Sequence, residues 1–197
     1  METNVSTVIV VTGASRGIGK AIALSLAAPD TALIINCSKS AGRLELVKEE
    51  IIKKGALCET FVGDVSNYST VNEMFDLAIS IYGKVNVLIN NAGIASIGLF
   101  QDMTPDMWNN IMSVNLAVQD MLRRHCGKII NISSVWGLYG ASCEVAYSAT
   151  KGAINSFTKA LAKELAPSNI QVNAIACGAI DTEMNGHLSP EELQELA

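Results

Sequence analysis

The sequence predicts an α/β fold, in which a parallel sheet carries helices on both faces. Six short apolar runs alternate with longer segments of helical periodicity, and no linker interrupts them. This alternation is typical of βαβ units, whose right-handed crossovers place helices on both sides of the sheet. Hydrophobic residues make up 49% of the chain and aromatic residues 5%, which suits the aliphatic core of a covered parallel sheet.

The expected elements follow one another along the whole chain. Strands are predicted at 8–11, 32–35, 57–62, 85–89, 129–132 and 170–175. Helices are predicted at 17–28, 40–54, 67–82, 105–125 and 146–166. Pro105 after Thr104 indicates a helix start, and Gly55 indicates a helix end. A chain of 197 residues is expected to form one domain, 1–197.

Charge and hydropathy exclude several classes of partner. The net charge is −5 and no long basic run is present, which argues against nucleic-acid binding. The apolar runs are far shorter than the ~18 residues of a membrane-spanning helix, so no membrane segment is expected. Residues 1–6 are polar and lead straight into a strand, so no signal peptide is expected.

The five cysteines point to a reducing compartment. They are odd in number and show no metal-like spacing, so they are interpreted as scattered buried thiols and no metal site is expected. The chain is therefore expected to be cytoplasmic. The cysteines are Cys37, Cys58, Cys126, Cys143 and Cys177.

A glycine-rich turn follows the first predicted strand directly. The segment reads Thr-Gly-Ala-Ser-Arg-Gly-Ile-Gly over residues 12–19, and an apolar helix begins within it. Glycines at a strand-to-helix turn let the backbone approach a pyrophosphate, with helix N-terminal amides aimed at it. The turn predicts a dinucleotide site, with candidate residues Gly13, Ser15, Arg16, Gly17, Ile18 and Gly19.

Tyr147 and Lys151 are predicted to lie one turn apart on one helix face, and Ser134 stands thirteen positions before the tyrosine. A free tyrosine titrates near ~10 and is a poor proton donor at neutral pH. A lysine cation nearby favours the phenolate, so we expect the pKa of Tyr147 to be lowered. Pairs of this kind are also common on helix surfaces, and the rest of the chain favours the functional interpretation.

Together these motifs resemble the short-chain dehydrogenase/reductase family, whose glycine motif is TGxxxGIG. Asn-Asn-Ala-Gly at 90–93 matches the family's NNAG motif after the fourth strand. Asn115, Ser134, Tyr147 and Lys151 fall where the family has its Asn-Ser-Tyr-Lys tetrad. The resemblance covers about residues 7 to 190 and implies a Rossmann-type doubly wound, three-layer α/β/α fold. Within the family, the sequence looks most like the bacterial 3-oxoacyl-[acyl carrier protein] reductases.

The resemblance implies a role for each member of the tetrad. Tyr147 would donate a proton to a substrate carbonyl, and Lys151 would lower its pKa and bind the nicotinamide ribose. Ser134 would polarise the carbonyl, the family spacing selecting it over Ser133. Asn115 would hold a water linking Lys151 to solvent.

Further cofactor contacts follow from the same resemblance. Asp64 and Val65 would contact the adenine, although Asp64 could equally cap the helix near Asn67. The remaining implied contacts are Asn91, Ala92, Gly93, Ile180 and Thr182.

The expected cofactor is NADPH. Enzymes of this fold that prefer NAD usually carry an acidic residue at the end of the second strand. Here residues 36–39 read Asn-Cys-Ser-Lys, without a carboxylate. The guanidinium of Arg16 suits the extra 2′-phosphate, and Ser38 and Lys39 would help to bind it.

The sequence departs from the family pattern in three places. Cys177 stands where the family has proline, which predicts a less rigid loop. The segment 115–127 is about nine residues shorter than the family pattern. At 3.6 residues per turn this removes about two and a half helical turns, so one face would swing to the opposite side, away from the family's dimer contact. The chain also ends before the family's last helix and seventh strand. A homotetramer is expected if further residues complete the chain, and an impaired assembly otherwise.

The leading hypothesis is NADPH-dependent reduction of a 3-oxoacyl thioester in fatty acid biosynthesis, with Arg123 and Arg124 contacting the acidic carrier protein. A sugar, polyol or hydroxysteroid dehydrogenase is the alternative among enzymes. A non-catalytic NADP-binding sensor or scaffold is the alternative of another class.

Overall fold

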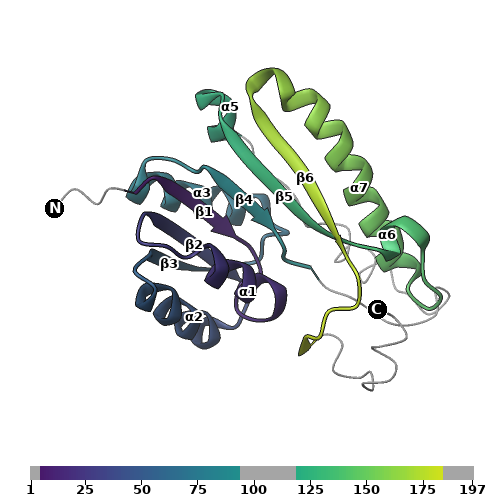
Figure 1. Cartoon of the computed structure of the whole chain (residues 1–197), viewed down its shortest axis with the longest axis horizontal. Helices are drawn as coiled ribbons and strands as arrows, with labels where there is room; N and C mark the ends of the chain where they lie inside the picture. The colour runs from purple at the N-terminus through teal and green to yellow at the C-terminus, as the bar shows by residue number, and fades with distance from the viewer. Residues whose placement is uncertain (1–4, 94–118, 184–197) are drawn as a thin grey trace.

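The structure is a computed structural model, and it describes residues 5–93 and 119–183. Its core is a six-stranded parallel sheet in the order β3-β2-β1-β4-β5-β6 (Figure 1). The strands are β1 Thr7–Val11, β2 Thr31–Cys37, β3 Leu57–Val62, β4 Val87–Asn90, β5 Gly127–Ser134 and β6 Ile170–Cys177. The helices are α1 Gly17–Leu26, α2 Ala41–Lys53, α3 Tyr68–Tyr82, α5 Gln119–Arg124, α6 Trp136–Tyr139, α7 Val145–Leu165 and the 3₁₀ helix η2 Ala166–Ser168.

The six predicted strands and the helices predicted at 17–28, 40–54, 67–82 and 146–166 are confirmed, with small differences in their bounds. α1 ends at Leu26 rather than 28, because Pro29 disfavours a helical conformation at the residue before it. β4 begins at Val87 rather than 85, and the Asn86 side chain just before it accepts a hydrogen bond from Val8 N at 2.9 Å. Of the helix predicted at 105–125, only α5 lies within the described residues, and the helix start at Thr104 and Pro105 lies outside them.

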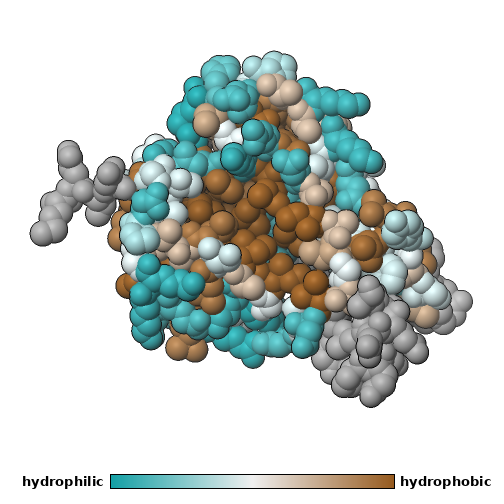
Figure 2. Space-filling view, viewed as in Figure 1, coloured by the Kyte–Doolittle hydropathy of each residue, from teal (hydrophilic) through white to brown (hydrophobic). Residues whose placement is uncertain are grey.

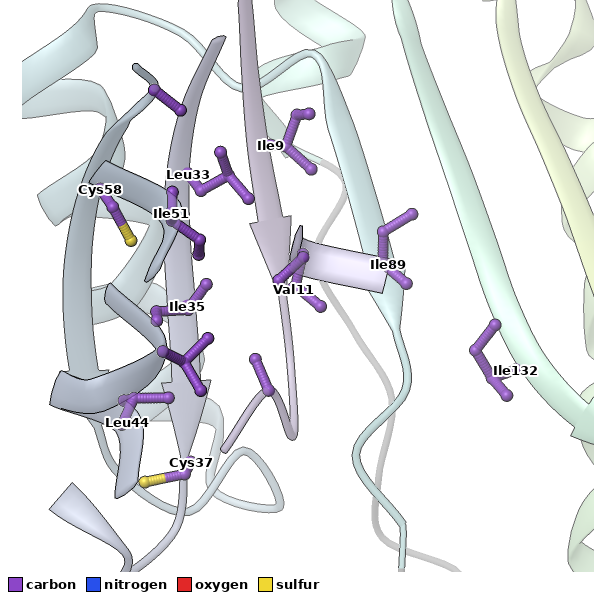
Figure 3. Close-up of a cluster of buried hydrophobic side chains, with 14 residues drawn as sticks. Ile9, Val11, Leu33, Ile35, Cys37, Leu44, Ile51, Cys58, Ile89 and Ile132 are labelled. Carbon is purple, nitrogen blue, oxygen red and sulfur yellow. The ribbon is translucent and has the colours of Figure 1, made fainter. Parts of the chain in front are cut away.

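Two apolar clusters place helices on both faces of the sheet. Ile9 and Val11 of β1 belong to one cluster with residues of α1 and α2, which Figure 3 shows, with Ile132 of β5 at its edge. Val10 points to the other face, where it packs in a cluster with residues of α3, α5 and α7. Alternation along β1 therefore divides the molecule into the three expected layers.

The strand order creates the place for a site. β1 pairs with β2 on one side and with β4 on the other, so the chain reverses its direction of travel across the sheet at β1. In open parallel sheets, ligands bind outside the carboxyl ends of the strands at such a switch point. The glycine-rich turn and residues 91–93 both lie there, since they directly follow β1 and β4.

One part of the sheet face beside α1 and α2 is apolar and open. Ile175 on β6 is 51% exposed, because α7 packs against the opposite face of that strand through Leu165 and Val172. Figure 2 shows apolar residues gathered in the middle of this view, between α1 and α2 and the β5–β6 pair.

The cysteines differ from expectation in their burial. Cys37 and Cys58 are buried, whereas Cys126 and Cys143 are exposed and Cys177 is half-buried. The interpretation of all five as buried thiols was therefore wrong, since two of them lie in turns outside the core. Within the part of the chain that the structure describes, no helix is long and apolar enough to cross a membrane.

Candidate active site

The glycine-rich turn has a backbone that other residues could not adopt without strain. Gly13 and Gly17 have φ values of 65° and 54°, in the left-handed region that favours glycine. A Cβ on Gly13 would lie 2.9 Å from Ala92 Cα, and one on Gly19 would collide with the carbonyl oxygen of Gly13. The turn therefore keeps an open backbone surface at the N-terminus of α1, as a pyrophosphate requires.

Thr12 and Asn91 join this turn to the end of β4. The Thr12 hydroxyl accepts hydrogen bonds from Asn91 N at 3.0 Å and Ala92 N at 2.9 Å. The Asn91 amide donates to the carbonyl oxygens of Thr12 at 3.0 Å and Gly13 at 3.2 Å. The two motifs predicted to hold cofactor are therefore one hydrogen-bonded unit.

Asn36, near the end of β2, is a structural residue. Its side chain is buried, and its amide donates to the carbonyl oxygens of Phe61 at 3.1 Å and Gly63 at 3.0 Å. Its own carbonyl accepts from Ala14 N at 2.8 Å. Asn36 therefore fastens β2 to both β3 and the glycine-rich turn, a role that the sequence pattern did not reveal.

Lys151 is buried with its charge directed at the end of β5. The side chain is 8% exposed, and Nζ donates to the carbonyl oxygen of Ile132 at 2.8 Å. Burial lowers the pKa of this ammonium group, and Cys177 acts in the opposite direction. A Cβ on Gly93 would lie 3.9 Å from Nζ, so the lysine also borders the segment that follows β4.

Tyr147 stands beside this lysine, but its pKa shifts the opposite way from our expectation. Lys151 Nζ lies 5.5 Å from the centre of the Tyr147 ring. Burial raises the pKa of the phenol, and a side-chain hydrogen bond with Ser134 lowers it by less. The expected lowering was therefore wrong, because burial raises the pKa more than the Ser134 hydrogen bond lowers it, and the nearby Glu144 and Cys177 raise it further.

The structure separates Ser134 from Ser133. Ser134 shares a hydrogen bond with Tyr147 and accepts another from Trp136 N at 3.2 Å. Ser133 points to the other side of β5, where its hydroxyl donates to the carbonyl oxygen of Lys151 at 3.3 Å. Ser134 is the serine that meets the tyrosine, and Ser133 holds the backbone of α7.

A buried polar chain lies beneath these residues. The Asn90 amide donates to Asn131 Oδ1 at 2.9 Å, and the Asn131 amide donates to Thr158 Oγ1 at 2.9 Å. Asn131 is 1% exposed. These hydrogen bonds link β4, β5 and α7, the helix that carries Lys151. Sequence reasoning missed Asn131 and Thr158, although a buried strand containing an asparagine was a signal for them.

Three other residues that were predicted to contact the cofactor have different surroundings. Arg16 is exposed and pairs with Glu183, with 3.1 Å between Nη1 and Oε2. Asp64 accepts from Ser66 N at 2.9 Å, which makes a turn before α3, and it does not cap the helix itself. Thr182 lies over Gly17, since a Cβ there would be 3.7 Å from its methyl group.

The remaining predicted residues differ in their exposure. Ser38, Lys39 and Ile180 are exposed after β2 and β6, whereas Val65 packs against the cluster beneath α3. Asn115 lies outside the described residues, so its position in the tetrad stays a prediction.

Arg123 and Arg124 lie near the amino-terminal end of β5, at the end of the sheet opposite the site. They end α5, just before β5 begins at Gly127, and Arg124 donates to the carbonyl oxygen of Val85. β5 then runs to Ser134, roughly 25 Å away at about 3.3 Å per residue.

Comparison with known proteins identifies the family. The model of the short chain dehydrogenase family matches residues 7–193. The chain belongs to this family. A 3-oxoacyl-[acyl-carrier-protein] reductase from Synechocystis is 38% identical over 195 residues, covering 94% of this chain and 79% of the relative. A reductase of the same name from Staphylococcus aureus is 39% identical over 194 residues, with 94% and 78% covered.

Solved structures of this short-chain dehydrogenase family also superpose on the chain. A putative short-chain alcohol dehydrogenase from Sinorhizobium meliloti is 32% identical with a TM-score of 0.88, covering 96% of this chain and 79% of that one. An NAD⁺-bound xylitol dehydrogenase is 32% identical with a TM-score of 0.82, with 89% and 71% covered. The Rossmann-type fold is thereby confirmed.

Proposed function

We propose that this protein reduces a carbonyl to a secondary alcohol with NADPH, and that its substrate is a 3-oxoacyl group on acyl carrier protein. The observation that carries the chemistry is that Tyr147 lies beside both Ser134 and Lys151, and that Lys151 borders Gly93. The substrate class is supported by the relatives that bear the name of 3-oxoacyl-[acyl-carrier-protein] reductase. The reaction belongs to fatty acid biosynthesis.

The residues present fit a nicotinamide dinucleotide. The strained turn offers backbone amides at a helix N-terminus, and the positions of Gly13 and Gly19 would be filled by any Cβ. Asn91 and Ala92 would complete the cradle, Lys151 would reach the nicotinamide ribose, and Thr182 would approach the carboxamide. When bound, the cofactor supplies the hydride that reduces the carbonyl carbon.

The side chains of this protein would handle the proton and the oxygen. Tyr147 holds its proton because burial raises its pKa, and it would pass that proton to the carbonyl oxygen as the carbon is reduced. The Ser134 hydroxyl would hold the same oxygen, where negative charge develops. The Lys151 ammonium would stabilise the phenolate that remains, and Asn115 would support the return of a proton from solvent.

The preference for NADPH is supported by charge. Arg16 is exposed at the start of α1, and the end of β2 carries the buried amide of Asn36 in place of a carboxylate. Lys39 and Ser38 are close in sequence to that end.

The proposal includes the location of the protein, its oligomeric state and the docking site of the carrier protein. A cytoplasmic homotetramer is expected by analogy with the family. A carrier protein at Arg123 and Arg124 would have to deliver its acyl chain across the length of β5.

A second candidate function is the oxidation of a sugar or polyol with NAD⁺. It is favoured by the structural similarity to an NAD⁺-bound xylitol dehydrogenase. The same serine, tyrosine and lysine would serve, because removing a proton from an alcohol reverses the proposed step.

The proposal is tested by turnover of purified protein. Acetoacetyl thioester with NADPH should give 3-hydroxybutyryl thioester and NADP⁺ in equal amounts, with one proton consumed. Rates should be much lower with NADH, and with xylitol and NAD⁺. Tight NADPH binding without turnover across a panel of ketones would leave the non-catalytic binding protein as the better account. A preference for polyol and NAD⁺ would favour the second candidate.

A further inference from the structure

Two arginines from separate parts of the chain hold one carboxylate in front of the glycine-rich turn. Arg16 Nη1 lies 3.1 Å from Glu183 Oε2, and Arg43 Nη1 lies 2.9 Å from the same oxygen and 3.3 Å from Oε1. All three side chains are more than half exposed. The hydrogen bonds from Arg43 and Arg16 hold the pKa of Glu183 below its ordinary value, so the carboxylate is an anion at neutral pH.

The arginines reach this carboxylate from both sides of the cofactor cradle. Arg16 stands at the N-cap of α1, within the glycine-rich turn. Arg43 lies in the first turn of α2, which follows the end of β2. In a dinucleotide-binding sheet, an arginine near the end of the second strand accommodates the 2′-phosphate of NADP. Glu183 directly follows Thr182, whose side chain lies over Gly17.

We propose that Arg43 joins Arg16 in recognising the 2′-phosphate, and that Glu183 is a tethered anion which occupies the two guanidiniums until NADP displaces it. This inference rests on the proposed use of NADPH. A carboxylate and a phosphate each offer two oxygens that can accept a pair of hydrogen bonds from one guanidinium, so a phosphate can replace the carboxylate. A phosphate monoester carries more negative charge than a carboxylate, which favours the exchange.

The exchange gives the protein a selective cofactor site. NADH lacks the 2′-phosphate, so it would meet the arginines still paired with Glu183 and would gain nothing from them. NADPH would take both guanidiniums and release Glu183 to solvent. The exposed pairs with Glu183 are weak because water screens them. Glu183 therefore lowers affinity for NADPH without blocking it.

The test measures dissociation constants of NADPH and NADH by fluorescence titration. Arg43→Gln should weaken NADPH binding by about tenfold, the loss of one charge-assisted contact, and should leave NADH binding within about twofold. Glu183→Gln should tighten NADPH binding several-fold and leave NADH unchanged. In an Arg16→Gln/Arg43→Gln background, Glu183→Gln should have no effect on either cofactor, because the arginines that it occupies are gone.

Two exposed positions provide charge-matched controls. Lys53→Gln removes a cation from the other end of α2, and Glu49→Gln removes a carboxylate from the same helix. Both should leave the ratio of the two dissociation constants unchanged. Circular dichroism and melting temperature should show that every variant is folded, as expected for exposed side chains.

The outcomes separate this inference from the proposed function. If the unaltered protein does not prefer NADPH to NADH, the proposed cofactor is wrong. If it prefers NADPH and Arg43→Gln keeps that preference, only the role of Arg43 fails. If Glu183→Gln weakens binding of NADH, the carboxylate is a ligand of the ribose hydroxyls and the tethered-anion role is overturned.

Discussion

The Nζ of Lys151 lies 5.5 Å from the centre of the Tyr147 ring while it donates to the carbonyl oxygen of Ile132 at 2.8 Å. The cation and the ring are therefore held against each other by the end of β5. Both groups are shifted toward their neutral forms, since burial raises the pKa of the phenol and lowers that of the ammonium. The tyrosine consequently keeps its proton at neutral pH, which is the form that a carbonyl reduction consumes.

Replacing the phenol should separate chemistry from binding. Tyr147→Phe keeps the ring beside Lys151 and removes the proton donor, so kcat for ketone reduction should fall by about 10²–10⁴-fold. NADPH affinity should change little. Stopped-flow absorbance gives the rate, and titration gives the affinity. Activity that survives this change would show that another group donates the proton.

The ionisation of Tyr147 should occur above that of an ordinary tyrosine. Because its folded pKa is raised, the phenol should remain protonated through neutral pH and ionise above about 10 in the free protein. The difference in tyrosinate absorbance between the unaltered protein and Tyr147→Phe isolates this group. Ser134→Ala removes a hydrogen bond that lowers the pKa, so the titration should move to still higher pH. A midpoint below 10 would mean that Lys151 outweighs burial.

The glycine-rich turn should tolerate no side chain at Gly13. Gly13→Ala combines a φ of 65° with a Cβ placed 2.9 Å from Ala92 Cα, and should lower the free energy of unfolding by about 1–3 kcal/mol. NADPH binding should weaken as well. Gly42 in α2 is the matched control, since nothing lies within 4 Å of its Cβ. Gly42→Ala should raise stability by up to about 1 kcal/mol. Urea denaturation measures both, and equal effects would contradict the strain argument.

The polar chain under the site should stabilise the fold. Asn131→Ala would leave the Asn90 amide without its acceptor, at a cost of about 1–3 kcal/mol, while the Thr158 hydroxyl keeps its hydrogen bond to the carbonyl oxygen of Ile154. Asn173→Ala on the exposed face of β6 is the control, with an expected change within about 0.5 kcal/mol. Chemical denaturation compares the two. Similar small changes in the stability of both variants would show that the hydrogen bonds of Asn131 contribute nothing to the stability of the fold.

Much of the site was predictable because its signals are local. A glycine-rich turn after a strand predicts a backbone that can approach a pyrophosphate, and Gly13 and Gly17 lie in such a turn with a positive φ. Helical spacing alone places Tyr147 and Lys151 on one face of α7. The alternation of strands and helices predicted the parallel sheet, because each βαβ unit has a preferred hand and a preferred length.

Other features depend on contacts between distant segments. The Arg43–Glu183 pair joins residues 140 positions apart, and the choice of Ser134 over Ser133 depends on which side of β5 faces Tyr147. The direction of the Tyr147 pKa follows from how much water the packing removes, which spacing along a helix does not determine.

The sequence by itself determined which chemical groups this protein has and in which local geometry they stand, since backbone sterics and helical periodicity act over a few residues. Only the tertiary structure decided the protonation state of these groups. The sheet and α7 bury Lys151 and Tyr147 together, and the loss of water there sets their protonation more strongly than the charge of either on the other.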